Sequence, residues 1–374
     1  PIVEGLIGAG EGSNTLLLDG AGWFDHQLAG FDRVMKQGPG TYIVSGLSPA
    51  TRLDLGEGTL EIDGDYQFAE AGLLATVART DGSAGQLKIG GTGVLNGTLA
   101  VEREQGLYQP ATYDVVVADT LSGSFTDVLL PESLPLLEFA AEQTADRVQI
   151  SVTPHSYASA ASNEVEASTG DYLDRIAPQA SGDLANTLGT FQTLSGGKFR
   201  TAFASLSPAV HESATATTFN TTTQYNQTLF KRMHSTRSHI ESTDDRLAYS
   251  QTERHAIWMD GFGHWARQDA QGGLAGYDYR LAGAALGADR LMADDLLVGV
   301  SYGQSNADID MDDRMAKGDI DSYFGSLYGS YFTDCMYVDA TVSYGRQRYE
   351  NTRRIEVGTV SGAAHSSPSM LSMV

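Results

Sequence analysis

The stretch YVDATVSYGRQRY, residues 337–349, alternates apolar and polar side chains. One face of an extended strand would carry Val338, Ala340, Val342 and Tyr344, and the other would carry Asp339, Thr341, Ser343 and Gln347. Strands of membrane β-barrels show this pattern, because one face meets lipid and the other meets a wet interior. The stretch therefore predicts a membrane β-strand.

Four similar stretches precede it, separated by segments that contain Gly, Asp or Asn. They read IWMDGFGHWARQ (257–268), YDYRLAGAALGADRL (277–291), LLVGVSYGQSNADI (296–309) and DIDSYFGSLYGSYF (319–332). In the last of these, Tyr323 and Tyr331 bound one apolar face, as aromatic girdles do at two membrane interfaces. The residues after Arg254 have room for about six strands, fewer than the eight of the smallest single-chain barrels. We therefore expect an incomplete antiparallel outer-membrane barrel over residues 255–374.

The two ends of the chain suggest a fragment. The final residues, GAAHSSPSMLSMV (362–374), show no alternation after Val360, so we expect a truncation or a reading-frame error there rather than a strand. The chain starts at Pro1, without Met or a signal peptide, so an N-terminal part is expected to be missing.

The composition narrows the class of protein. The 374 residues include 42 Gly, 17 Tyr and 10 Pro, which favours a turn-rich, mainly all-β protein. The formal net charge of -23 would repel a phosphate backbone, so no nucleic-acid partner is expected. Cys335 is the only cysteine, which excludes an internal disulfide and suits a chain that must stay free of disulfide cross-links during export. No apolar run reaches the roughly 18 residues of a transmembrane helix, a test that does not apply to strands.

Short β-rich runs recur between Gly-bearing turns from Pro1 to about Val152. They are TLLLDG (15–20), DRVMKQGPGTYIVSG (32–46), TRLDLGEGTLEIDG (51–64), GQLKIGGTGVLNGTLAVE (85–102), ATYDVVVA (111–118) and RVQISV (147–152). Units spaced by about 20 residues cannot each bury their own apolar face. Stacking them as coils of a parallel β-helix solves this problem, and a β-sandwich is the alternative.

The segment that follows has helical spacing. Short helices are predicted around Val165, Tyr172, Leu173 and Ile176, and around Leu184, Leu188 and Phe191. Ser207 and Pro208 are typical of an N-cap followed by the first helical residue, so a longer helix should start there and reach about His239. Its many threonines are mediocre helix formers, so packing must support it; an exposed Thr-rich linker is the alternative.

Three of these segments carry a resemblance. KQGPGTYIVSG (36–46), GQLKIGGTGVLNGTLAVE (85–102) and YQPATYDVVVADTLSGSFTDV (108–128) resemble the passenger end of a bacterial autotransporter, a type V secretion protein. The last two resemble its autochaperone segment. The helical linker and the strands from Ala256 fit the same family in the same order, so the resemblance covers nearly all of the chain.

The resemblance implies three regions. Residues 1–155 would be the C-terminal coils of a right-handed β-helical passenger, residues 156–254 a helical linker with the lumen helix at about 208–240, and residues 255–374 part of the translocator barrel. Such a protein exports its own passenger and anchors it on the surface of a Gram-negative bacterium. The implied partners are outer-membrane lipid, the passenger chain itself and the barrel assembly machinery. The coils near Leu87 to Val128 would help passenger folding to begin.

The catalytic and metal-binding motifs are incomplete. Residues 299–303 match G-x-S-x-G, but they lie inside a predicted strand and not at a strand-to-helix turn. Ser195 and Lys198 fit S-x-x-K without the companion motifs. The spacing of calcium-loop ligands is present at Asp308, Asp310, Asp312 and Asp319, but Asp313 stands where such a loop needs Gly. Loose surface binding of a divalent cation by these carboxylates stays open.

The remaining titratable residues indicate no zinc site and no catalytic site. The eight His form no zinc pattern. Two acidic pairs, Glu57 with Glu61 and Asp63 with Asp65, have residue types used in glycoside cleavage, but turns produce such pairs routinely. We therefore expect no enzyme activity, no catalytic residue, no cofactor and no metal in this chain.

Two other functions stay open. An adhesin or a polysaccharide-active β-helix protein would use the barrel only as an anchor, and its specificity would lie in coils before Pro1. A soluble all-β structural protein would need no detergent for the segment after Ala256. The sequence does not give the passenger's target or a cleavage site.

Overall fold

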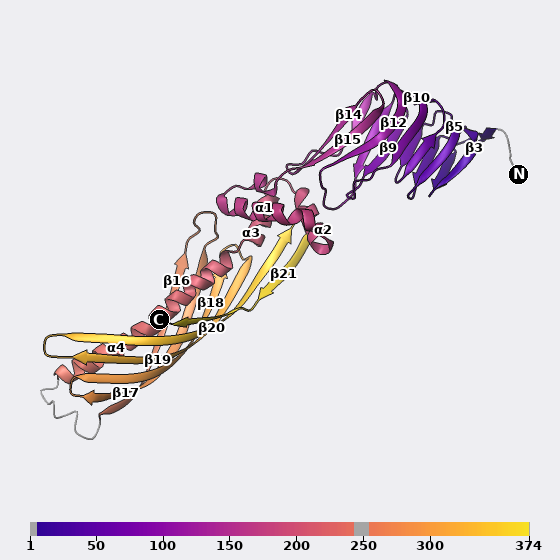
Figure 1. Cartoon of the computed structure of the whole chain (residues 1–374). Coiled ribbons are helices and arrows are strands. Elements are labelled where there is room, and N and C mark those ends of the chain that lie inside the picture. Colours follow the sequence, from indigo (N-terminus) through magenta and orange to yellow (C-terminus); the bar gives the residue numbers. More distant parts are fainter. Residues whose placement is uncertain (1–5, 243–253, 374) are drawn as a thin grey trace. The chain divides into compact units, whose positions relative to one another are not determined.

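The computed structural model describes residues 6–242 and 254–373 and is mostly β (Figure 1). The chain forms two compact units, residues 1–161 with 170–199, and residues 162–169 with 200–374. Within the described residues, no helix combines the length and the apolar character needed to cross a membrane.

The N-terminal unit contains two sheets, and the chain alternates between them. The strands of the first sheet, in spatial order, are β1 (Leu6–Gly8), β3 (Gly22–Ala29), β5 (Thr41–Leu47), β7 (Thr59–Ile62), β10 (Gln86–Leu95), β12 (Ala111–Gly123), β15 (Arg147–Pro154) and β14 (Leu137–Gln143), with β8 (Tyr66–Gln67) also on β10. Those of the second sheet are β13 (Asp127–Leu129), β11 (Thr98–Arg103), β9 (Leu73–Ala78), β6 (Arg52–Leu55), β4 (Arg33–Gln37) and β2 (Thr15–Asp19).

The core of this unit is built from apolar residues that occupy the same register position on successive parallel strands. In the first sheet, Val44, Ile62 and Ile89 are aligned neighbours, and all three are buried. The second sheet aligns Val34, Leu53, Leu74 and Leu99 in the same way. Each run therefore buries its apolar face against the next run, as its repeat spacing predicts.

The parallel arrangement ends earlier than the sequence suggests. RVQISV was predicted to continue the parallel coils, but β15 runs antiparallel to both β12 and β14. The chain between β14 and β15 is short, and a short connection can join only antiparallel neighbours. The expectation of parallel coils is therefore wrong for residues 137–154.

Helices follow this unit along the chain. They are η1 (Tyr157–Ala160), α1 (Glu164–Ile176), η2 (Ala177–Gln179), α2 (Gly182–Gln192), α3 (Lys198–Leu206) and α4 (Ala209–Ser242). Ala209 N donates a hydrogen bond to Ser207 Oγ (3.3 Å), which confirms the predicted N-cap. Several threonines of α4 donate their hydroxyl hydrogen to the carbonyl oxygen four residues earlier, among them Thr218, Thr221 and Thr222. Residues 243–253 of the predicted linker lie outside the described residues.

The C-terminal unit contains a seven-stranded antiparallel sheet. Its strands are β16 (His255–Gln268), β17 (Tyr277–Ala293), β18 (Leu296–Met311), β19 (Ala316–Phe332), β20 (Tyr337–Val357), β21 (Val360–Ser366) and β22 (Ser369–Met373). The five predicted strands are confirmed. Four of them keep within a few residues of their predicted bounds, whereas β20 continues past the predicted end at Tyr349 to Val357. In Figure 1, α4 runs along the long strands of this sheet.

The end of the chain corrects the sequence-based expectation. Residues after Val360 were expected not to form a strand, but β21 and β22 both pair antiparallel with β20. Backbone hydrogen bonds to the long edge of β20 need no alternation of side chains, and Gly358, at φ 59°, provides the left-handed turn that brings β21 back.

Candidate functional site

The C-terminal sheet has two different faces, and one of them carries α4. The helix contacts β16 to β20 and is held by an apolar cluster toward each end. Val210 near its start packs with the cluster that contains Ile309 and Ile320. Leu229, nearer its end, packs with the cluster that contains Trp258. This packing explains how a Thr-rich helix is stable here, because tertiary contacts replace intrinsic propensity.

Between these clusters, hydrogen bonds join α4 to the sheet. They connect Thr218 with Tyr349 (2.9 Å), Asn220 with Tyr279 (2.9 Å) and Asn226 with Ser343 (2.7 Å). Thr218 and Ser343 are almost fully buried. Buried polar groups are costly unless they are paired, so these bonds fix the rotation of the helix on the sheet.

Tyr225 is the best-anchored residue of the helix. It is fully buried, and its hydroxyl lies 2.8 Å from Ser301 Oγ and accepts a hydrogen bond from Ser326 (3.0 Å). Its ring stacks on that of Phe324 with a centroid distance of 4.5 Å. A Cβ at Gly303 would lie 2.8 Å from Tyr225 Cδ2, so the absence of a side chain there lets the helix approach β18.

Three ion pairs hold the second half of α4. Lys231 Nζ lies 2.9 Å from Asp260 Oδ2, Arg232 Nε lies 2.8 Å from Asp289 Oδ2, and Arg237 Nη1 lies 2.9 Å from Asp339 Oδ1. The side chains of Asp289 and of the Arg237–Asp339 pair are buried. Arg237 also lies 3.7 Å above the ring of Tyr337.

Sequence reasoning missed these ion pairs. The sequence contained a signal for them. The three aspartates lie on β16, β17 and β20, at positions where the alternation of side chains faces the helix, while Lys231, Arg232 and Arg237 lie within two turns of one helix. Asp339 alone was placed on the polar face from the sequence, and the structure confirms that placement.

Between the two apolar clusters, the helix-facing surface of the sheet is polar even where it is deeply buried. Ser305, Ser322 and Gln347 occupy one cross-strand row on β18, β19 and β20. Each of them has a buried oxygen without a hydrogen-bond partner among the described residues. A surface of hydroxyls and amides suits contact with water and does not suit a dry apolar core.

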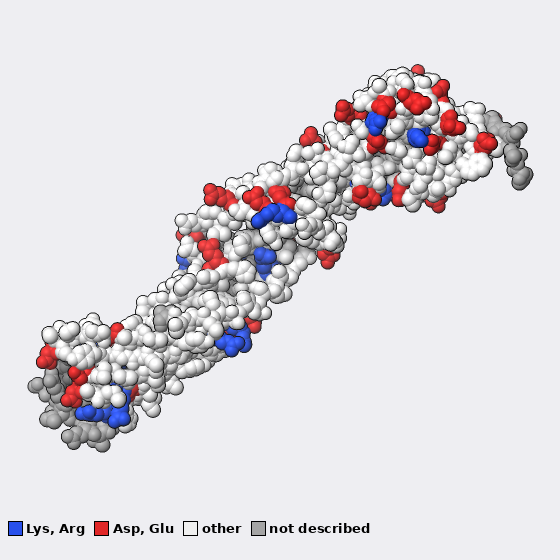
Figure 2. Space-filling model, viewed as in Figure 1, with Lys and Arg blue, Asp and Glu red and all other residues white. Residues whose placement is uncertain are grey.

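The opposite face of the sheet is apolar across its width. Exposed side chains on successive strands include Met259, Leu286, Tyr302, Leu327 and Val342. Trp265 is 82% exposed, although large apolar residues rarely stay in water when a fold can bury them. Figure 2 shows how sparse charged residues are over much of the visible face of this unit. A continuous apolar face of this size favours contact with lipid.

The incomplete catalytic motifs stay incomplete in three dimensions. Ser301 lies inside β18, and Tyr225 occupies the space near its hydroxyl. The S-x-x-K pair of Ser195 and Lys198 falls at the start of α3. Among the described residues, no group of three or more His, Cys, Asp or Glu side chains is arranged to hold a metal ion.

The predicted acidic loop lies partly on strands. Asp308 and Asp310 belong to β18, and Asp319 is the register partner of Asp308 on β19. Asp310 forms an ion pair with Lys317 (3.0 Å), and Asp312 forms one with Arg267 (3.3 Å). These carboxylates therefore do not surround a common point.

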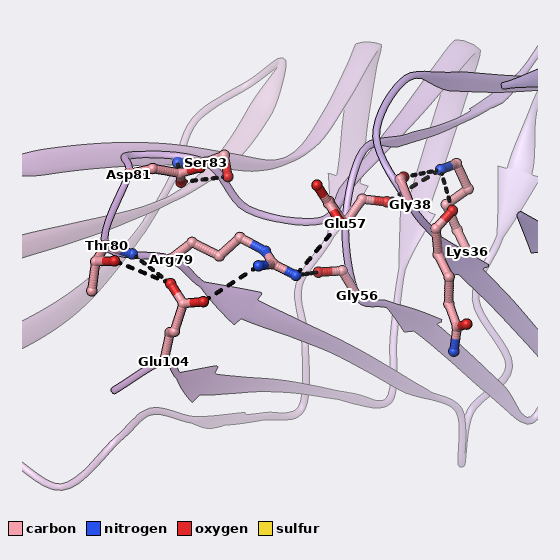
Figure 3. Close-up of polar contacts among 10 residues, drawn as sticks. Lys36, Gly38, Gly56, Glu57, Arg79, Thr80, Asp81, Ser83 and Glu104 are labelled. Atoms are coloured by element: carbon pink, nitrogen blue, oxygen red, sulfur yellow. Dashed lines mark hydrogen bonds and ion pairs between the residues drawn. The ribbon is translucent and has the colours of Figure 1, made fainter. Parts of the chain in front are cut away.

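In the N-terminal unit, two cations bind turn carbonyls (Figure 3). Lys36 Nζ donates to the carbonyl oxygens of Gln37 (2.9 Å), Gly38 (2.6 Å) and Glu57 (3.3 Å). Burial lowers the pKa of Lys36, while the Glu57 carboxylate opposes this effect. Arg79 donates to the carbonyl of Gly56 (3.2 Å) from a neighbouring turn. These contacts join successive turns of the unit.

Three of the four acids considered for glycoside cleavage have other partners. Glu57 lies 3.8 Å from Arg79, and Glu61 accepts a hydrogen bond from Lys88 (2.8 Å). Asp65 accepts a hydrogen bond from the backbone N–H of Thr92 (2.6 Å). Their partners are basic side chains and backbone, which is a structural arrangement.

The C-terminal part is similar to a known protein family. Residues 257–373 match the family model of the autotransporter beta-domain. Outer membrane protein B of Rickettsia prowazekii (strain Madrid E) is 37% identical over 78 residues, which are 20% of this chain and 5% of that protein. Outer membrane protein B of Rickettsia typhi (strain ATCC VR-144 / Wilmington) is 38% identical over 78 residues, with the same coverage.

A related protein shows a more distant similarity. Outer membrane protein A of Rickettsia conorii (strain ATCC VR-613 / Malish 7) is 26% identical over 110 residues, which are 28% of this chain and 5% of that protein. The chain thus spans about 5% of the length of the curated relatives that it matches.

Proposed function

Because the chain carries an autotransporter β-domain of the outer membrane at residues 257–373, we propose that its antiparallel sheet is part of a translocator barrel with α4 inside. One observation carries this proposal. The face of the sheet that binds α4 carries buried polar residues between two apolar clusters, and the opposite face is apolar from β16 to β20. A barrel wall needs this division, because lipid lies outside and water or a threaded chain lies inside.

The domain division belongs to the same proposal. Residues 1–155 are C-terminal coils of a β-helical passenger, residues 156–254 are the linker with the lumen helix, and residues 255–374 are the barrel segment. The alternation of the chain between two sheets, with apolar residues aligned from strand to strand, supports the β-helix. A closed sandwich of antiparallel strands would not give parallel pairing from β1 to β12.

The proposed activity is export of the protein's own passenger and its retention at the cell surface. Each folded coil presents strand edges and an aligned apolar row to the next coil, so folding outside biases a threaded chain against sliding back. The coils near Leu87 to Val128 would provide the first template. The implied partners are outer-membrane lipid, the passenger itself and the barrel assembly machinery.

Export and anchoring require no chemistry from the β-domain, which is a transport and anchor domain. The contacts of α4 define its proposed task. Apolar clusters, hydrogen bonds and ion pairs along its length hold it against the sheet, so it can tether the exported passenger and fill the interior.

The test is an immunoblot of the outer-membrane and soluble fractions of the native organism with an antibody against residues 207–349, with and without boiling. A closed barrel resists detergent at room temperature and unfolds on boiling, so we expect a band whose mobility changes on boiling. A band found only in the soluble fraction, with the same mobility in both samples, would contradict the proposal and favour a soluble all-β protein.

A further inference from the structure

A shallow pocket lies on the apolar face of the C-terminal sheet, close to the turn between β17 and β18. Its volume is about 260 Å³, and it is lined by His255, Ala288, Asp289, Arg290, Val298, Gly299 and Val300. His255 and Arg290 are exposed. The pocket therefore combines two nitrogen-bearing side chains with an apolar wall.

The register of the sheet explains this combination. His255 is the cross-strand partner of Arg290, and Arg290 is the partner of Val298, so the three side chains share one face and one row. The adjacent row contains Ile257, Ala288 and Val300, all apolar. On β16 and β17, the apolar face thus ends where the two polar residues begin.

Arg290 has no ion pair or hydrogen bond to its side chain within residues 6–242 and 254–373. Two acids close to Arg290 in the sequence have other partners. Asp289 points to the helix side and binds Arg232, and Asp294 binds Arg254 (3.2 Å). The guanidinium group of Arg290 is therefore available to an external anion at the edge of the apolar face.

We propose that this pocket binds the phosphate of a phospholipid headgroup, with an acyl chain along Val298 and Val300. The assignment rests on the proposed function, because it places the apolar face in the membrane. Guanidinium matches phosphate with two parallel hydrogen bonds, and an imidazole N–H adds a third. The apolar wall selects a lipid over free phosphate, because a free phosphate ion would gain nothing from it.

The experiment measures lipid binding by native mass spectrometry of the purified full chain in non-ionic detergent. The probes are phosphatidylglycerol and, separately, inorganic phosphate. We compare the unchanged chain with the variant Arg290→Gln and with the matched control Arg280→Gln. Arg280 is also exposed and lies on the same face of β17, but beyond the other end of the apolar face.

We expect Arg290→Gln to weaken phosphatidylglycerol binding about fivefold and Arg280→Gln to leave it unchanged, since one basic residue contributes about a factor of five near an anionic lipid. Equal weakening in both variants, or none in either, would contradict the proposal that the lipid binds at this pocket. Equal binding of inorganic phosphate would overturn the lipid assignment. If the unchanged chain binds no phosphatidylglycerol but still shifts its mobility on boiling, only the pocket is rejected, whereas an unchanged chain without that shift rejects the barrel proposal as well.

Discussion

At the residue scale, Gly303 decides how closely α4 approaches β18. An added side chain would meet Tyr225, whose ring is fixed by Phe324 and whose hydroxyl is fixed by Ser301 and Ser326. We expect Gly303→Val to lower the free energy of unfolding by about 1–3 kcal/mol, as overpacking of a filled core does. The measurement is denaturant unfolding of the chain in detergent, followed by tyrosine and tryptophan fluorescence.

Gly325 on β19 provides the matched control. It lies on the opposite face, and an added Cβ would meet no atom within 4 Å. Gly325→Val should therefore change stability little. Equal losses in the two variants would show that strand glycines matter for another reason than the space for Tyr225.

The same residues show that a match to a catalytic motif can have a purely structural cause. Gly299, Ser301 and Gly303 match a nucleophile motif in the sequence, but both glycines make room for tyrosine rings and Ser301 binds a tyrosine hydroxyl. Alternation alone could place these residues on the helix-facing side. It could not name their partners, because Tyr225 comes from an element about 76 residues away, and such contacts depend on the packed structure.

At the element scale, the ion pair between Arg237 and Asp339 fixes the second half of α4. Both side chains are buried, with exposed fractions of 6% and 12%. We expect Asp339→Asn to cost about 3 kcal/mol of unfolding free energy, because it leaves a buried guanidinium without its counter-charge. Denaturant unfolding in detergent measures this cost.

Asp294→Asn is the control for charge loss alone. Asp294 also pairs with an arginine, Arg254, but its side chain is 97% exposed. Exposed pairs contribute about 0–1 kcal/mol, so its loss should be small. If Asp339→Asn cost no more than Asp294→Asn, the proposed role of the buried pair in holding the helix would be wrong.

The elements themselves were predictable to different degrees. Strands β16 to β20 follow from alternation, and the start of α4 follows from its N-cap, because each signal is local. β21 and β22 were missed because they are held by backbone pairing with β20 and not by a side-chain pattern. The antiparallel pairing of β15 with β12 and β14 was missed because strand direction depends on connection length.

At the scale of the whole molecule, the proposed export depends on a passenger end that folds into a template. Leu95 and Leu99 are buried in the N-terminal unit, and Leu99 continues the aligned row of Leu53 and Leu74. Replacing both leucines with Asp should stall surface display, because buried charges without partners destabilise a core by more than about 4 kcal/mol. Antibody binding to intact cells measures display, and an immunoblot of the same cells measures total protein.

The control for this prediction is Leu129→Asp, on the neighbouring strand β13. Leu129 is 57% exposed, so the new carboxylate stays in water and the aligned row is intact. We expect display close to that of the unchanged protein. Normal display of the Leu95→Asp, Leu99→Asp variant, with an unchanged total amount of protein, would mean that export does not need a folded template. Folding of the passenger outside the cell would then not explain why the chain moves outward. If display is lost while the mobility of the barrel still changes on boiling, the passenger has failed to fold outside and the barrel is intact.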